Sequence, residues 1–214
     1  MPTSTWRNLD QERRERVLRA AMAEFGRHGY SGGSLNVIAR EAGVAKGSLF
    51  QYFTDKREFF AAVAQETSLR VRAEMAQWLA GPEPGQPFDD FLCDALSGWV
   101  RYFAKHPLER AVTAATHLER DPQVRAAVRE RVYRVYLESL RPLLERAVER
   151  GDLRPDADLD ALLSILLLVL PQLALAPFEP GLDPVFRLYG RHPDELREVI
   201  RRLVTALLAG FIAR

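Results

Sequence analysis

"GVAKGSLFQYFTDK", residues 43–56, is the stretch of sequence that decides the fold. Gly47 stands where a helical pattern is running, and a glycine inside a helix costs about 1 kcal/mol relative to alanine. Three aromatic residues, Phe50, Tyr52 and Phe53, follow it closely. A chain tolerates such a glycine where its backbone must lie close against another molecule, because glycine has no side chain to hold the two apart. The stretch therefore predicts a binding surface as well as a helix.

The residues in front of this stretch complete a helix-turn-helix. A first helix is expected over about residues 9–28, with Gly29 as its stop. A short helix begins after Ser34, a good N-cap residue, and ends at Gly43. The second short helix, residues 45–52, follows that turn. In a helix-turn-helix the second helix enters the major groove of DNA.

The side chains around Gly47 suit a contact with DNA. Lys46 and Ser48 flank the glycine and point outward in this arrangement. Tyr52 and Lys56 lie where the next turn would meet phosphate oxygens, which take most hydrogen bonds in such complexes. A solvated turn of ordinary Gly, Ser and Lys residues has the same composition, so the pattern alone leaves both interpretations open.

A longer segment, residues 13–60, resembles the DNA-binding head of the TetR family of transcriptional regulators; it reads RRERVLRAAMAEFGRHGYSGGSLNVIAREAGVAKGSLFQYFTDKREFF. The resemblance runs without a gap through an aromatic–Gly pair, IA-x-x-AGV, KGSLF-x-YF and Lys56. It implies an all-α fold in which a helix-turn-helix domain, residues 9–56, precedes a helical ligand-binding and dimerisation domain, residues 57–214. It also implies which residues face the operator or hold its backbone: Ser34, Ala45, Lys46, Gly47, Ser48, Phe50, Gln51, Tyr52 and Lys56.

Three positions depart from the family pattern. The family usually has Ser or Thr where this chain has Ala45, and a missing N-cap hydroxyl costs about 1 kcal/mol. Phe50 stands where Tyr is common, so it can offer packing but no hydroxyl to a phosphate. Val37 replaces a residue that is often polar. These departures affect individual contacts and leave the predicted fold unchanged.

Composition limits the class of protein. The 214 residues suffice for one large domain or two small ones, and 47% hydrophobic residues exclude a wholly disordered chain. Residues 1–56 hold nine Lys and Arg against six Asp and Glu, while the remainder holds 21 against 23. A basic head on a mildly acidic body points to a nucleic-acid partner.

The predicted location is the cytoplasm. Cys93 is the only cysteine, so the chain has no internal disulfide and no cysteine-based zinc site, as is typical of a reducing interior. The N-terminus has no signal-peptide pattern. The most apolar run, residues 162–176, contains Pro171 and is too short for an ordinary membrane span.

Helical periodicity continues to the end of the chain, punctuated by Gly and Pro. Thr54 is expected to cap a long helix, with Asp55 in its first turn, that ends at the loop GPEPGQP, residues 81–87. Further helices are expected at 88–105, 107–118, 122–150, 159–176 and 194–213. Pro142 should kink the third of these.

The helix at 159–176 is apolar nearly all round, so it must be covered on every side. A second subunit is a natural cover, and the resemblance implies a homodimer formed by the last two long helices. The residues predicted for this interface are Leu162, Ile165, Val169, Leu196, Ile200, Leu203, Leu207 and Phe211. An ordinary core within one chain is the alternative.

The middle helices carry aromatic and polar residues at helical spacing, which indicates a pocket for a small hydrophobic ligand. The predicted lining is Phe91, Trp99, Phe103, Thr113, His117, Tyr133, Tyr136 and Leu166. Aromatic stripes also form ordinary cores, and that interpretation stays open.

Two functions remain. One is a repressor that binds a pseudo-palindromic DNA duplex as a homodimer and responds to a small hydrophobic effector. The other is a helix-turn-helix protein whose C-terminal domain docks another protein and binds no small molecule. The four histidines show no metal-binding spacing such as HExxH, and GxSxG and phosphate-loop motifs are absent. We therefore expect no enzyme activity, no metal, no cofactor and no membrane partner.

Overall fold

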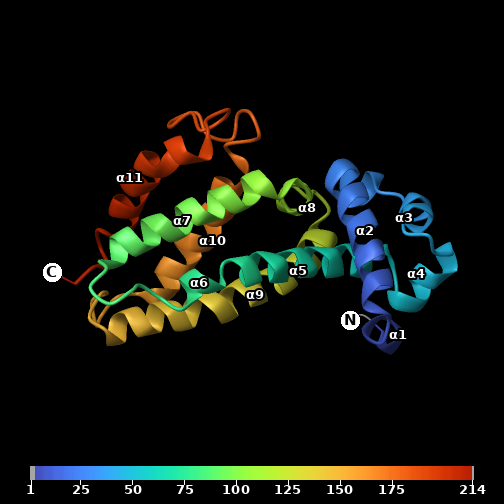
Figure 1. Ribbon diagram of the computed structural model, residues 1–214, viewed down its shortest axis with the longest axis horizontal. Coiled ribbons are helices and arrows are strands. Elements are labelled where there is room, and N and C mark those ends of the chain that lie inside the picture. Colours follow the sequence, from blue (N-terminus) through green and yellow to red (C-terminus); the bar gives the residue numbers. More distant parts are fainter. Residues whose placement is uncertain (1–2, 214) are drawn as a thin grey trace. The chain divides into compact units, whose positions relative to one another are not determined.

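The structure is a computed structural model that describes residues 3–213 (Figure 1). Its elements in chain order are α1 Ser4–Arg7, α2 Gln11–Gly32, α3 Leu35–Glu41, α4 Lys46–Tyr52, α5 Lys56–Glu74, α6 Ala76–Leu79, α7 Phe88–Lys105, α8 Pro107–His117, α9 Pro122–Glu149, α10 Leu159–Leu175, the 3-10 helix η1 Pro193–Leu196 and α11 Arg197–Leu208. Within the described residues the one β-type contact outside these helices is a bridge between Leu153 and Ile212. The predicted all-α fold is confirmed.

The chain forms two compact units. The first unit holds the described residues up to Arg70 together with His106–Arg134. The second holds Val71–Lys105 and the chain from Val135 onward. Helices α5 and α9 therefore each contribute residues to both units.

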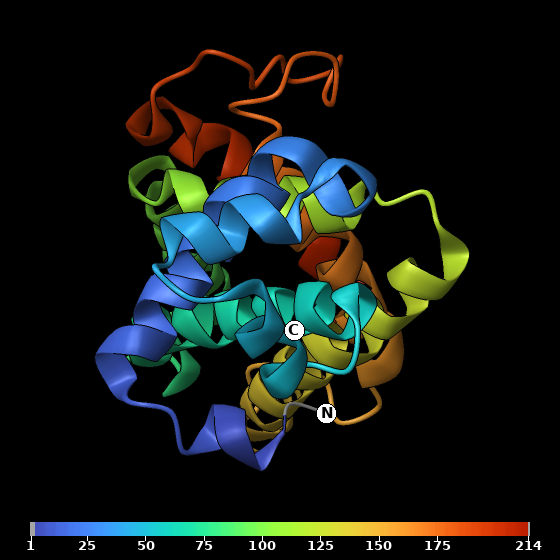
Figure 2. The same ribbon diagram turned by 90° about the vertical axis from the view of Figure 1, so that its right-hand side faces the viewer.

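The first unit is built around α2, which buries one apolar face because Val17, Ala21 and Phe25 recur at helical spacing. Helix α8 packs closely on α2 at Gly26, where a Cβ atom would lie 2.7 Å from the Cβ of Ala111. Figure 2 gives a second view of this unit, with α2 in blue. The close approach explains why a small residue stands at that point of α2.

The helix-turn-helix is formed as predicted. Gly29 has φ +65° and interrupts the helical backbone near the end of α2. The Ser34 hydroxyl accepts a hydrogen bond from the Val37 amide at 3.4 Å and so caps α3. Gly43 has φ +66°, in the left-handed region that favours glycine, and makes the turn into α4.

The start of α5 corrects one prediction. The Asp55 carboxylate, rather than Thr54, caps the helix, since its Oδ1 accepts a hydrogen bond from the Glu58 amide at 2.7 Å. A carboxylate also interacts favourably with the positive end of the helix dipole. The predicted long helix ends earlier than expected, at Glu74, and α6 follows after Met75.

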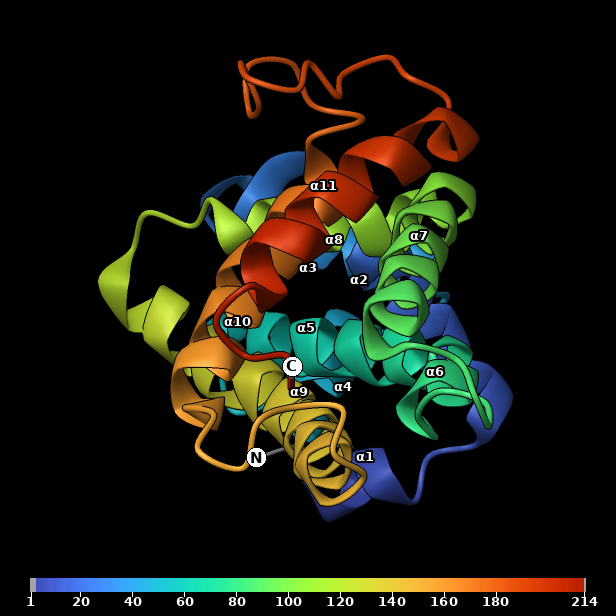
Figure 3. The ribbon, with the colours of Figure 1, turned by 90° about the vertical axis from the view of Figure 1, so that its left-hand side faces the viewer.

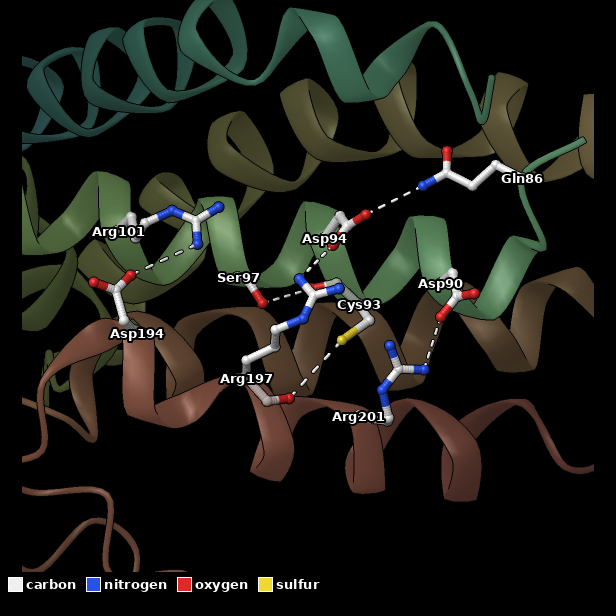
Figure 4. A network of polar contacts seen from close by, with 9 residues as sticks. All are labelled: Gln86, Asp90, Cys93, Asp94, Ser97, Arg101, Asp194, Arg197 and Arg201. Carbon is white, nitrogen blue, oxygen red and sulfur yellow. Dashed lines mark hydrogen bonds and ion pairs between the residues drawn. The ribbon is translucent and has the colours of Figure 1, made fainter. Parts of the chain in front are cut away.

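The second unit packs α7 against α10 and α11 (Figure 3). Ion pairs join α7 to the C-terminal helices (Figure 4): Arg201 Nη1 lies 2.7 Å from Asp90 Oδ1, Arg197 pairs with Asp94, and Arg101 with Asp194. Exposed pairs of this kind contribute little stability each. Cys93 is fully buried beside them, where burial raises the pKa of its thiol.

The C-terminal helix is shorter than predicted. It begins at Arg197 after η1 and ends at Leu208, because the chain then turns so that the Phe211 carbonyl can accept from the Arg154 amide at 2.8 Å. By contrast, α7 has the predicted bounds, and α8 and α9 begin at the predicted prolines. Among residues 3–213, every helix is too short or too polar to cross a lipid bilayer.

Candidate functional site

Helix α4 separates its side chains sharply between core and solvent. Leu49, Tyr52 and the following Phe53 are buried in the first unit. The exposed residues are Ala45, Lys46, Gly47, Phe50 and Gln51, and Ser48 is half-buried. All of these outward residues were among the predicted DNA contacts, and α4 presents them on one surface of the unit. Their role in DNA binding stays a prediction.

Contacts within the chain do not explain why residue 47 is a glycine. A Cβ atom built at this position would meet no protein atom within 4 Å, and the backbone is ordinary helix without positive φ. Alanine would therefore fit the free protein and would favour the helix by about 1 kcal/mol. The glycine leaves open space on the exposed face, where another molecule's backbone could approach.

Two departures from the expected sequence pattern lie on the exposed side of α4 and its N-cap. Ala45 has the extended backbone of an N-cap residue but makes no side-chain hydrogen bond to the helix. Phe50 leaves 50% of its surface exposed. An exposed ring on the outward face of a short helix can contact the methyl group of a thymine, which lies in the major groove.

The structure places Tyr52 differently from the prediction. Only 3% of the residue is exposed, and Trp6 of the unpredicted helix α1 lies against its ring at a centroid distance of 5.6 Å. Tyr52 is thus a core residue of the first unit, and the expected outward orientation toward a phosphate is not found.

Lys56 is half-buried at the start of α5. Its ammonium donates to the Ser31 carbonyl at 3.3 Å and lies 5.0 Å from the centroid of the Tyr30 ring. Burial lowers the pKa of Lys56, and the carboxylates of Glu24 and Glu119 act in the opposite direction. The hydroxyl of Ser34 is likewise engaged, as the cap of α3.

The second unit contains an apolar cavity of about 70 Å³ that is partly open to solvent. Helix α7 supplies one wall, since six of its apolar residues recur at helical spacing on one face. The full lining is Val71, Arg72, Met75, Trp78, Leu79, Phe88, Phe91, Leu92, Ala95, Leu96, Trp99, Tyr136, Ser139, Leu140, Leu143, Leu144, Leu166 and Leu170. Nearly all of these side chains are aliphatic or aromatic, so the interior suits an apolar molecule.

Two polar groups of the lining have partners within the chain. Trp99 Nε1 donates to the Leu170 carbonyl at 2.9 Å, and the Ser139 hydroxyl donates to the Val135 carbonyl at 2.7 Å. A charged group inside the cavity would lose its hydration without a matching partner, which is costly. The interior therefore favours an apolar group, while Arg72, the charged residue of the lining, is exposed.

Four of the eight predicted ligand contacts line this cavity: Phe91, Trp99, Tyr136 and Leu166. Phe103 is buried behind Trp99, with ring centroids 5.0 Å apart, and does not reach the cavity. The predicted lining did not include Trp78 or the other lining residues of α5 and α6, which lie near the end of the predicted long helix. The spacing within residues 88–99 did contain the signal for Phe88, Leu92 and Leu96.

The other three predicted contacts, Thr113, His117 and Tyr133, belong to the first unit and line no part of the cavity. The Thr113 hydroxyl donates to the Glu109 carbonyl at 2.9 Å. Burial, and next the positive charge of Arg129, lower the pKa of His117. The Tyr133 hydroxyl accepts from Arg129 at 3.2 Å.

The predicted dimer residues divide by exposure. Three of them are buried within their own chain: Leu162, Leu196 and Ile200. These residues belong to the core of the second unit and cannot contact a second subunit directly. Ile165 is exposed, and Leu168, which the predicted set omitted, is 72% exposed. The remaining members, half-buried, are Val169, Leu203, Leu207 and Phe211. A dimer stays a prediction.

No group of three or more His, Cys, Asp or Glu residues suited to a metal ion occurs in the part of the chain that the structure describes.

Two family models match the chain. Residues 17–63 match the model described as "Bacterial regulatory proteins, tetR family", and residues 89–186 match "Tetracyclin repressor-like, C-terminal domain". The first model covers the helix-turn-helix, and the second covers most of the lining of the cavity.

Individual proteins agree with these matches. The HTH-type transcriptional repressor AcnR of Corynebacterium diphtheriae is 29% identical over 74% of this chain and 77% of its own length. The probable acrEF/envCD operon repressor of Escherichia coli K12 is 26% identical over 72% of this chain and 70% of its own. The solved structure of the fatty acid degradation regulator FadR from Bacillus halodurans superimposes with a TM-score of 0.72 at 20% identity, covering 92% of this chain and 98% of that one.

Proposed function

Because the chain belongs to the TetR family of transcriptional regulators, we propose that it is a homodimeric repressor that a small apolar molecule releases from its operator. As a member of this family it is a DNA-binding regulator and not an enzyme. We assign DNA binding to residues 9–56 and ligand binding and dimerisation to residues 57–214, and we place the protein in the cytoplasm. Two relatives named as repressors, AcnR and the probable acrEF/envCD operon repressor, support the direction of regulation.

The DNA contact is assigned to the outward surface of α4. Lys46 and Gln51 offer donors that can reach base edges, and Gly47 allows the backbone of α4 to come close to the duplex. A two-fold dimer presents two such helices, so the operator is a pseudo-palindrome with half-sites about 34 Å apart.

The dimer is assigned to α10 and α11. Ile165 and Leu168 expose apolar side chains on α10, and Leu203 and Leu207 are half-buried on α11. An exposed leucine on a helix that is otherwise apolar is stabilised when a second copy covers it.

The observation that carries the ligand assignment is the apolar cavity of the second unit. A body that served only to dock another protein would need no such cavity. At about 70 Å³ it is smaller than ordinary ligand sites of roughly 300–1,000 Å³, so a ligand must displace part of the lining. Val71 and Met75 belong to that lining, and Val71 lies on α5, the helix that begins at Lys56 directly after the helix-turn-helix.

Displacement of Val71 would move α5, because a packed helix transmits a shift rather than absorbing it. The ligand then binds the DNA-free protein more tightly, and by linkage DNA weakens ligand binding by the same factor.

The test uses a duplex enriched from a randomised library by the protein itself and the neutral apolar fluorophore N-phenyl-1-naphthylamine as the probe. We expect the probe to bind the wild type and to lower its affinity for the duplex. Ala95→Leu fills the cavity and should abolish probe binding and release while leaving duplex affinity unchanged. Ala104→Leu, on the same helix but outside the lining, is the matched control. Probe binding that is equal with and without the duplex, or that survives Ala95→Leu, would contradict the proposal.

A further inference from the structure

Helix α4 would not be stable in isolation. It has only seven residues, its N-cap makes no side-chain hydrogen bond, and Gly47 lies within it. Isolated helices shorter than about 12–15 residues are marginal in water even with favourable sequences. The order of this helix must therefore come from contacts with the rest of the first unit.

Part of that support comes from the N-terminal segment, residues 3–9. The last carbonyl groups of a helix lack partners inside the helix. Here the Thr3 hydroxyl donates to the Gln51 carbonyl at 2.7 Å, and the Thr3 amide donates to the Tyr52 carbonyl at 3.1 Å. One residue, 48 positions away from Gln51 in sequence, thus binds two of the orphan carbonyls at the end of α4.

Trp6 provides the second part of the support. Its ring lies 5.6 Å from that of Tyr52 and 4.8 Å from that of Phe53, and only 8% of the residue is exposed. Phe53 in turn stacks on Phe59, with centroids 4.3 Å apart and planes at 15°. The end of α4 is therefore held between Trp6 on one side and the aromatic core of the unit on the other. Figures 1 and 2 both show α1 beside α4.

The segment is itself ordered by a local bond. Thr3 caps α1, since its hydroxyl oxygen accepts from the Trp6 amide at 3.3 Å. The same hydroxyl thus fixes the position of Trp6 and binds the end of α4. Loss of either residue should disturb the other's contact.

We propose that residues 3–9 form a clasp that positions α4 for reading DNA, with Trp6 as the positioning residue. The clasp fixes the C-terminal end of α4, and the exposed side chains of Phe50 and Gln51 keep their places only while that end is fixed. Trp6 itself contacts no base or phosphate. The proposal rests on α4 being the DNA-reading helix, and its first test is made without DNA.

The first test is amide hydrogen exchange of the full chain, free of DNA. Trp6→Ala removes two aromatic contacts and should speed exchange of the α4 amides by about tenfold or more, since each such pair contributes measurably to stability. Amides of α2 near Val17–Phe25 should keep their rates. Trp6→Phe, which retains a ring, should exchange almost like the wild type.

A rescue separates a local role from a global one. Ala45→Ser adds the N-cap hydroxyl that α4 lacks, and should slow α4 exchange in the Trp6→Ala background. Thr3→Val, which keeps the shape of the side chain but loses its hydrogen bonds, gives a milder variant if Trp6→Ala unfolds the unit. Equal acceleration in α2 and α4, no acceleration in α4, or no rescue by Ala45→Ser would each overturn the proposal.

The second test measures affinity for a duplex enriched from a randomised library by the wild type. Trp6→Ala should weaken binding by about tenfold, with Trp6→Phe restoring most of it. The slope of log affinity against log salt should not change, because no phosphate contact is lost. A reduced slope would mean that the segment touches the DNA backbone, and unchanged affinity would mean that α4 needs no clasp; either result would overturn the proposal.

Discussion

Gly47→Ala should stabilise the free protein and weaken its binding to DNA. The Cβ atom added by alanine meets nothing within 4 Å in the free protein, so it causes no steric strain there. Alanine gains about 0.8–1 kcal/mol over glycine inside a helix. For a unit of this size, each kcal/mol moves the unfolding midpoint by about 4–8 °C. We therefore expect the transition of the first unit to rise by several degrees.

The DNA-bound protein should respond in the opposite direction. If the Gly47 backbone lies against the duplex, a new methyl group must push into a filled space, which costs about 1–3 kcal/mol. That corresponds to a loss of affinity of roughly 5- to 150-fold. The assay is fluorescence anisotropy with an enriched duplex, run beside calorimetry of the free protein.

Gly43→Ala is the matched control. Gly43 is also exposed, and its Cβ position is also empty within 4 Å, but its φ of +66° is unfavourable for alanine by about 1–2 kcal/mol. It should therefore lower the unfolding midpoint, in contrast to Gly47→Ala. Full operator affinity in the Gly47→Ala variant would refute the argument that its backbone approaches DNA, and a lowered midpoint would refute the stability argument.

Three further predictions concern other sites. Lys56→Ala should weaken binding to all duplexes alike and reduce the salt slope by about one; an unchanged slope would show that the ammonium stays on the Ser31 carbonyl. Burial and Arg129 lower the pKa of His117, so at mildly acidic pH the unfolded chain binds more protons than the folded one. The stability of the first unit should therefore fall as pH drops from about 7 through the lowered pKa. His117→Gln should flatten this pH dependence, as measured by denaturant titrations at several pH values. Leu168→Asp should give monomers by light scattering, whereas the equally exposed loop variant Val185→Asp should not; a dimeric Leu168→Asp protein would place the interface elsewhere.

Local sequence rules predicted the helix-turn-helix well because the ends of its helices depend on single residues. Ser34 as N-cap and Gly43 as the left-handed turn are properties of one side chain and one backbone angle, and both are found. Proline placed the starts of α8 and α9 for the same reason, since its fixed φ suits the first helical position. At the start of α5 two good caps adjoin, and sequence alone could not choose Asp55 over Thr54.

Features that depend on distant contacts were not predictable in this way. Helix α1 is only four residues long, and its order depends on packing against Tyr52 and Phe53, far away in sequence. For the same reason Tyr52 was expected to face outward. The cavity shows the same limit: helical spacing found Phe91 and Trp99, but assigned Thr113 and His117 to the same site although they lie in the other unit.

Helix α4 and its N-cap depart from local sequence rules at three exposed positions, and these departures are informative. Ala45 gives no cap, Gly47 weakens the interior and Phe50 exposes a ring, while the neighbouring helix α3 is capped normally by Ser34. Nothing in the fold of the first unit requires these three choices, since each side chain or missing side chain faces solvent. A sequence that departs from local rules without compensation nearby is expected where a surface binds something else. A substitution that stabilises free α4 at Ala45 or Gly47 therefore adds atoms on the surface assigned to DNA, so at these two positions the stability of the helix and its fit to the operator cannot be improved independently.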